Sequence, residues 1–157
     1  MFGMKTKTTL LALTLSVAAA ALSLAGPEAW MGTWKLNEAK SKLSPGAVKN
    51  TKVVYSTEKG EIRIMTEGVD KDGKPIRSVW SGKFDERDYL VALDPMVDTR
   101  SYKQIDANTL EFIVKKESQV IATGRVVLSA DGKTRTVTTT GTREGKPFEN
   151  VAVYDKQ

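Results

Sequence analysis

The chain has 157 residues, a formal net charge of +5, and neither cysteine nor histidine. This composition excludes disulfide bonds and thiolate chemistry, and it removes the commonest general base and metal ligand of proteins. Acidic and basic residues are interleaved along the chain without a block of like charge, which argues against a nucleic-acid-binding surface. We therefore expect no cofactor, no metal and no nucleic-acid partner.

Residues 1–25 carry the features of a signal peptide. Lys5 and Lys7 precede an apolar run over 10–24, and Ser23-Leu24-Ala25 places small residues at the −3 and −1 positions of a cleavage site. The run is short for a membrane span, which needs about 20 apolar residues. We predict cleavage after Ala25 and an exported protein, periplasmic or secreted, with no stable membrane insertion afterwards.

The remaining residues, 26–157, are predicted to form one domain. Apolar and polar residues alternate along most of it, with turn signals at short and regular intervals. This pattern is typical of an antiparallel sandwich or barrel. Ten strands are predicted, at 31–36, 51–57, 61–66, 75–84, 88–93, 98–105, 109–116, 119–128, 134–141 and 148–155.

Three of the predicted turns share an acidic residue followed by Gly-Lys, at Asp72-Gly73-Lys74, Asp131-Gly132-Lys133 and Glu144-Gly145-Lys146. Glycine adopts positive φ at little cost, so these sequences indicate hairpin turns. Short hairpins between consecutive strands predict an up-and-down meander, and closing the meander removes its exposed edges. The expected fold is all-β, a single antiparallel up-and-down barrel of eight to ten strands, and we expect a monomer.

The stretch from Asn37 to Lys49 lacks the strand pattern. Asn37 is suited to cap a short helical turn over 38–41, and Ser44-Pro45-Gly46 would end it. Because this segment joins the first two strands, we expect it to lie across one mouth of the barrel.

Several residues are candidates for lining an internal cavity because they combine aromatic rings with polar groups. They are Trp80, Tyr102, Arg125 and Tyr154. The same aromatic residues could instead fill a small core, since a barrel of this strand number either is filled by side chains or holds one small ligand.

Carboxylates cluster at Asp85, Glu86 and Asp88, and Asp94 and Asp98 flank a proline. Paired carboxylates perform acid–base chemistry only when burial separates their pKa values. These residues lie in connections between strands, where charged side chains are usually solvated. We assign no catalytic residue and do not expect an enzyme.

The segment 30–36, Trp-Met-Gly-Thr-Trp-Lys-Leu, resembles the first strand of the calycins, which include lipocalins and fatty-acid-binding proteins. The segments 32–42 and 151–157 are more closely similar to small exported bacterial proteins described only as lipocalin-like. The resemblance implies a barrel closed at one end by Gly32 and Trp34. It also implies that a basic residue from a late strand, Arg143 or Lys156, packs over that tryptophan.

The final strand departs from the fatty-acid-binding group. Those proteins hold the ligand carboxylate with an Arg-x-Tyr sequence, and the similar positions here are Ala152-Val153-Tyr154. The tyrosine is retained and the cation is missing. The resemblance therefore implies the fold rather than the group's standard ligand, and a neutral ligand or one anchored by Arg125 stays open.

Three functions are compatible with these patterns. The first is non-catalytic binding or carriage of a small apolar or amphipathic molecule in the bacterial cell envelope. The second is a protein-interaction or enzyme-inhibitor module with a filled barrel, acting through loops at Asp85–Asp88, Pro95 and Met96. The third, an enzyme acting within the barrel, ranks last because histidine and cysteine are absent.

Overall fold

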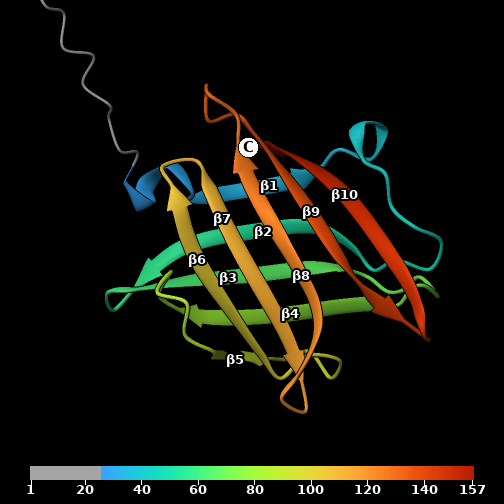
Figure 1. Cartoon of the computed structure of the whole chain (residues 1–157). Coiled ribbons are helices and arrows are strands. Elements are labelled where there is room, and N and C mark those ends of the chain that lie inside the picture. Colours follow the sequence, from blue (N-terminus) through green and yellow to red (C-terminus); the bar gives the residue numbers. More distant parts are fainter. Residues whose placement is uncertain (1–25) are drawn as a thin grey trace, which may run out of the picture.

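The computed structural model describes residues 26–157, which form a closed antiparallel barrel of ten strands (Figure 1). Each strand pairs with the next in the chain, and β1 also pairs with β10, so the expected up-and-down barrel is confirmed. The signal peptide predicted for residues 1–25 lies outside the described residues. The strands are β1 (Gly32–Leu36), β2 (Lys49–Glu58), β3 (Glu61–Val69), β4 (Pro75–Gly82), β5 (Tyr89–Ala92), β6 (Thr99–Asp106), β7 (Thr109–Lys116), β8 (Gln119–Leu128), β9 (Thr134–Arg143) and β10 (Lys146–Lys156).

All ten predicted strands are present, and no predicted boundary lies more than three residues from the observed one. The tight turns explain this agreement. Lys59 and Gly60 both have positive φ, 51° and 79°, as do Glu144 and Gly145, 51° and 74°. Two successive left-handed residues form the hairpin turn whose twist matches that of the flanking strands. The turn between β7 and β8 adopts the same φ pattern at Glu117 and Ser118, without glycine.

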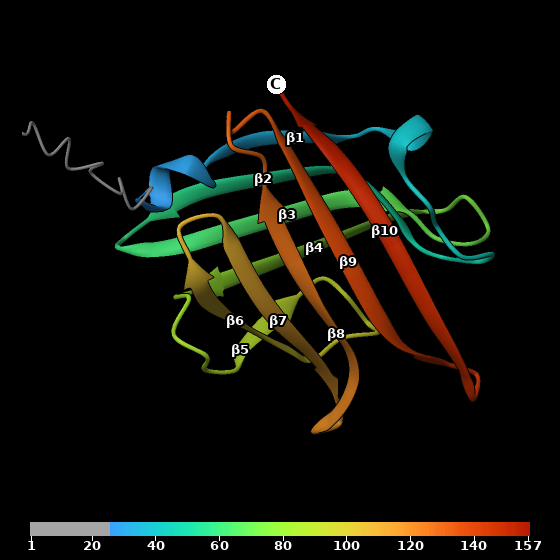
Figure 2. The same cartoon turned by 45° about the horizontal axis from the view of Figure 1, so that its top comes forward.

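The strands form two walls that face each other across the interior. Figure 1 shows β1 to β4 crossing behind β7 to β10, and Figure 2 shows the same arrangement from a second direction. The short strand β5 completes the barrel between β4 and β6 with only two paired positions on each side. The weakest part of the ladder is therefore at β5.

One end of the barrel is closed by the segment before β1. The short helix η1 (Pro27–Ala29) leads into Trp30, which is fully buried, as is Trp34. The Trp34 indole N–H donates to the Trp30 carbonyl oxygen at 3.0 Å. The ammonium of Lys156 lies 5.2 Å from the Trp34 ring centroid and donates to the Ala29 carbonyl at 3.4 Å. We call this the closed end, and the opposite one the far end.

The segment between β1 and β2 contains the predicted short helix, η2 (Glu38–Lys40), and the Asn37 side chain accepts from the Lys40 N–H at 3.2 Å. Its position differs from the expectation. Lys42 and Val151 exchange two backbone hydrogen bonds, of 2.7 and 2.8 Å, which fasten the segment to β10. The segment thus continues from β1 along β10, because the β10 edge beyond β1 still offers backbone partners.

Candidate ligand-binding site

A buried arginine stands inside the closed end of the barrel. Arg135 is near the start of β9 and is only 2% exposed. Its guanidinium carbon lies 5.1 Å from the ring centroid of Trp34, 4.8 Å from that of Tyr55 and 4.7 Å from that of Tyr154. These three rings come from β1, β2 and β10, on both sides of the closure. We call these four residues the arginine cage.

The Arg135 guanidinium is incompletely hydrogen-bonded. Its Nε and Nη1 atoms are buried and have no hydrogen-bond partner among residues 26–157. Aromatic faces attract the positive charge, by about 0.5–2 kcal/mol per ring, but they accept no conventional hydrogen bond at these distances. Buried polar groups in folded proteins are nearly always paired, so each exception calls for an explanation.

A second arginine shares this interior region. Arg100 is two residues before Tyr102 on β6, so both side chains are on the same face of the strand. The Arg100 Nη1 donates to the Tyr102 phenol oxygen at 3.4 Å, and its buried Nε has no partner among the described residues. The charges of Arg100 and Arg135 both act on Tyr55 and on Tyr154. We call Arg100, Arg135, Tyr55, Tyr102 and Tyr154 together the polar site.

The tyrosines of this site stay protonated at neutral pH. Burial raises the pKa of Tyr55 and the pKa of Tyr154 above the ordinary value for tyrosine, although the neighbouring guanidinium groups act to lower both. A neutral phenol donates or accepts a hydrogen bond but carries no charge. The phenols therefore do not neutralise the arginines.

Acidic side chains do not neutralise them either. Within residues 26–157, every ion pair joins other residues, and none includes Arg100 or Arg135. The Asp94 charge acts on Arg100 without forming an ion pair with it. The interior thus holds two guanidinium groups without a bound carboxylate.

The neighbouring part of the interior is a packed set of rings, which we call the aromatic cluster: Trp80, Phe84, Tyr89, Tyr102 and Phe112. Trp80 stacks on Phe84 with centroids 6.2 Å apart and meets Tyr102 edge-on at 4.8 Å. The Trp80 indole N–H donates to the Arg100 carbonyl oxygen at 2.8 Å. The cluster contacts the polar site through Tyr102.

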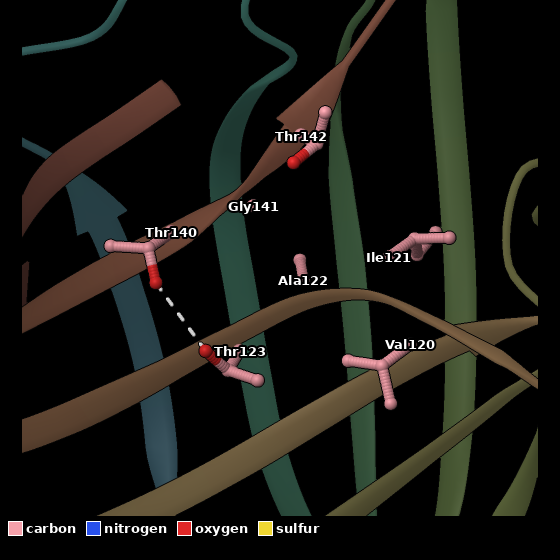
Figure 3. Close-up of a pocket in the computed structure, with 7 residues that line it drawn as sticks. All are labelled: Val120, Ile121, Ala122, Thr123, Thr140, Gly141 and Thr142. Atoms are coloured by element: carbon pink, nitrogen blue, oxygen red, sulfur yellow. Dashed lines mark hydrogen bonds between the residues drawn. The ribbon is translucent and has the colours of Figure 1, made fainter. Parts of the chain in front are cut away.

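A solvent-open hollow lies at the far end, where β8 begins and β9 ends (Figure 3). Its volume is ≈ 560 Å³, and Val120–Thr123 and Thr140–Thr142 line it. Thr123 and Thr140 share a hydroxyl hydrogen bond of 3.3 Å across the two strands. A second hollow, of ≈ 410 Å³, lies where β3 ends and β4 begins.

Three of the four residues expected to line a cavity lie inside the barrel. Trp80, Tyr102 and Tyr154 are buried; the Tyr102 ring meets Trp80 at 4.8 Å, and the Tyr154 ring lies 4.7 Å from the Arg135 guanidinium carbon. Arg125 lies on the outer surface instead, with 56% of its side chain exposed and an ion pair to Glu111. The reason is strand alternation, because the adjacent Gly124 faces inward and its missing side chain is replaced by the Phe112 ring.

Of the residues expected to close the barrel, Gly32 and Trp34 lie at the closed end and Arg143 does not. Gly32 begins β1 with φ 111° and pairs with Tyr55, and Trp34 is buried there. Arg143 lies at the end of β9 and contacts the Phe148 ring at 4.8 Å, away from Trp34. The two cations against Trp34 are Lys156 and Arg135.

Arg135 and Arg100 are the site residues that the sequence analysis missed. A usable signal exists in β9, where Arg135 shares a face with Val137 while threonines occupy the other face at 134, 136 and 138. An arginine on the apolar face of β9 would have indicated a charged interior.

Among residues 26–157, no group of three acidic residues could hold a metal ion, and no helix is long and apolar enough to span a membrane. Comparison with protein-family models finds no match, and neither does comparison with curated protein sequences.

Proposed function

We propose that this protein is a calycin-like carrier that binds a small apolar or amphipathic molecule inside its barrel, without catalysis, in the bacterial cell envelope. The observation that carries the proposal is the incomplete hydrogen bonding of Arg135 inside an aromatic wall. Buried N–H groups without protein acceptors are able to bind a polar group of a small ligand inside the barrel.

Native mass spectrometry of the protein, purified without detergent from cells that export it, tests this proposal. The expected spectrum contains the folded chain with one discrete small-molecule mass, released when the protein is unfolded. A clean unliganded mass from a stable, folded sample would contradict it.

A matched pair of variants tells an interior ligand from one bound outside. Ala152 packs against the core and pairs with Val137, so Ala152→Phe adds a ring to the interior. Glu149 lies exposed on the same strand, so Glu149→Phe adds the same ring outside. We expect the added mass to disappear from Ala152→Phe and to persist in Glu149→Phe, with both folds verified by circular dichroism.

The interaction-module function is supported by a different feature. Leu90, Leu93 and Met96, on β5 and the connection to β6, are 78%, 67% and 71% exposed. Large apolar side chains gathered at one solvent-facing site are typical of protein-binding surfaces. For this function, the same spectra would show a protein-sized added mass that is lost from Met96→Asp.

A further inference from the structure

A continuous apolar row crosses the outer face of β2 to β5, which follow one another in the barrel (Figure 1). Its members point outward because an adjacent residue of each strand is buried inside. They lie directly opposite one another in the strand register, and they are Val54, Met65, Val79 and Ala92. Leu90, two residues before Ala92, extends the row on the same face of β5 and is 78% exposed. We call these five residues the outer apolar row.

The opposite wall of the barrel differs from this one. The outward residues of β9 are threonines, so each row across β8, β9 and β10 includes a hydroxyl group. Val127, for example, lies opposite Thr136, and Arg125 lies opposite Thr138. Contiguous apolar side chains on a protein surface mark sites of interaction, so the outer apolar row is the stronger candidate for a docking surface.

Leu93, which directly follows β5, is another apolar residue that does not serve the fold. It is 67% exposed and has φ 67°. Glycine adopts this backbone conformation at little cost, whereas the Cβ atom of leucine makes it unfavourable. Folding therefore gains neither from the side chain of Leu93 nor from its backbone. A partner that covers the end of the row would give the side chain a role.

Basic side chains dominate both flanks of the row. On one flank the register aligns Lys35, Lys52, Glu67 and Arg77 across β1 to β4. Glu67 pairs with Lys52 at 3.4 Å and with Arg77 at 3.0 Å, so one carboxylate serves two cations. On the other flank Arg63 lies between two serines and pairs with Glu58 at 3.6 Å. The flanks thus carry more positive than negative charge.

Charge and spacing together specify the partner. A second copy of the chain would bring basic flanks against basic flanks, whereas an acidic partner complements them. Neighbouring strands are about 4.8 Å apart, close to the rise of about 5.4 Å for one helical turn. A helix lying across the strands therefore presents about one apolar side chain to each strand. Same-face side chains of an extended segment are about 6.8 Å apart and miss this spacing.

We propose that the outer face of β2 to β5 binds an acidic amphipathic helix of a partner protein. The apolar stripe of the helix lies on the outer apolar row, and its carboxylates pair with Lys35, Lys52, Arg63 and Arg77. Glu67 and Arg77 also line the second hollow, of ≈ 410 Å³, so this flank is recessed beside the row. The inference goes beyond the carrier function and does not depend on what the barrel holds.

NMR titration of the isotope-labelled protein with two synthetic peptides tests this proposal. Both peptides are amphipathic helices of about 18 residues, or five turns, with the same leucine stripe. One carries glutamates beside the stripe and the other carries lysines. We expect the glutamate peptide to bind about tenfold or more tightly and to shift the amide signals of β2 to β5. The signals of β8 to β10 should stay in place.

Three variants and a matched control test the surface itself. Leu90→Asp and Leu93→Gly replace exposed side chains, and the glycine also relieves the positive φ, so both proteins should fold. Each should weaken binding of the glutamate peptide by about fivefold or more. Arg77→Glu should weaken the glutamate peptide and strengthen the lysine peptide, which a general loss of structure would not do. The control, Val127→Asp on the opposite wall, should bind as the wild type does.

The other occupants are outcomes of the same test. Equal binding of the two peptides would overturn the acidic partner, and binding of neither would overturn the docking surface. A dimer in sedimentation that Leu90→Asp dissociates would overturn the proposal in favour of a second copy. Binding to phosphatidylglycerol vesicles but to neither peptide would overturn it in favour of an anionic membrane. The carrier function is judged separately, by the small-molecule mass in the native spectrum.

Discussion

The aromatic cluster and the arginine cage lie side by side in one barrel, but different interactions hold each of them together. In the cluster, apolar rings pack on each other, and the one indole N–H of Trp80 has its acceptor. In the cage, rings surround a charge whose Nε and Nη1 groups have no acceptor among residues 26–157. The cluster is what a stable core requires. The cage is less favourable than an apolar core of the same shape, which is typical of residues retained for binding.

The largest expected effect is in the aromatic cluster. Trp80→Ala removes a side chain that is 1% exposed and contacts three other rings. We expect a loss of about 3–5 kcal/mol in the free energy of unfolding, because the cavity cannot collapse around rigid neighbours. Urea denaturation of the variant and the wild type measures it. A loss below about 1 kcal/mol would mean that the cluster does not stabilise the fold.

The arginine cage should respond much less. Arg135→Met removes attraction to three rings, worth about 0.5–2 kcal/mol each, and also removes the desolvation penalty of an unpaired charge. Because the two effects oppose each other, we expect the free energy of unfolding to change by less than about 1.5 kcal/mol. The same urea denaturation measures it. A loss of unfolding free energy as large as that of Trp80→Ala would mean that Arg135 stabilises the fold as strongly as the aromatic cluster does.

Alkaline pH should destabilise the fold through the cage tyrosine Tyr55. Because burial raises the pKa of Tyr55, its phenol ionises in the unfolded chain near pH 10 while remaining neutral in the folded one. The corresponding stability is fully present below pH 10 and is lost as the pH rises above it. Urea midpoints at pH 8 and pH 11 should fall more for the wild type than for Tyr55→Phe. Equal falls of the two urea midpoints would mean that the Tyr55 phenol is exposed to water in the folded protein.

The smallest expected effect is outside both regions, at Asp98, which joins the β5–β6 connection to the β7–β8 turn. Hydrogen bonds from the Lys116 ammonium at 2.7 Å and from the Glu117 N–H at 2.6 Å lower the pKa of Asp98. The stability they provide is present above about pH 4 and lost as the pH falls through the lowered pKa. The stability advantage of the wild type over Asp98→Asn at pH 7 should shrink as the pH falls, since only the wild type loses this contact. Acid denaturation of both proteins, followed by circular dichroism, measures this. Parallel acid curves would contradict the assignment.

The strands and turns could be predicted because their determinants are local. Pairs such as Lys59-Gly60 have a backbone preference that specifies a two-residue hairpin, and alternation fixes the length of the strands on either side. The course of the segment after β1 was not predictable, because its pairing of Lys42 with Val151 depends on an edge formed by residues distant in sequence.

The site was predicted only in part, for a reason specific to β8 and β9. In a barrel, which face is inside depends on the apolar residues of each strand, and β8 alternates ambiguously because Gly124 has no side chain. Arg125 was therefore placed inside and Arg135 was overlooked. Trp80 and Tyr154 are inside because each shares a face with apolar residues of its own strand, Ile76 and Ala152. Tyr102 shares its face with Arg100 and Gln104, and it is inside because its ring packs against Trp80 and Phe112 of other strands.

The most direct test of a binding site inside the barrel is the NMR signal of the Arg135 Nε–H group, identified by its loss in Arg135→Lys. Adding back the small molecule released from the protein that exporting cells produce should shift this signal and leave that of Arg125 in place, because the buried Arg135 Nε has no acceptor among residues 26–157. An Arg135 signal that stays unchanged at a saturating concentration of that molecule, while the Arg125 signal moves, would place the ligand on the outer surface and contradict the account.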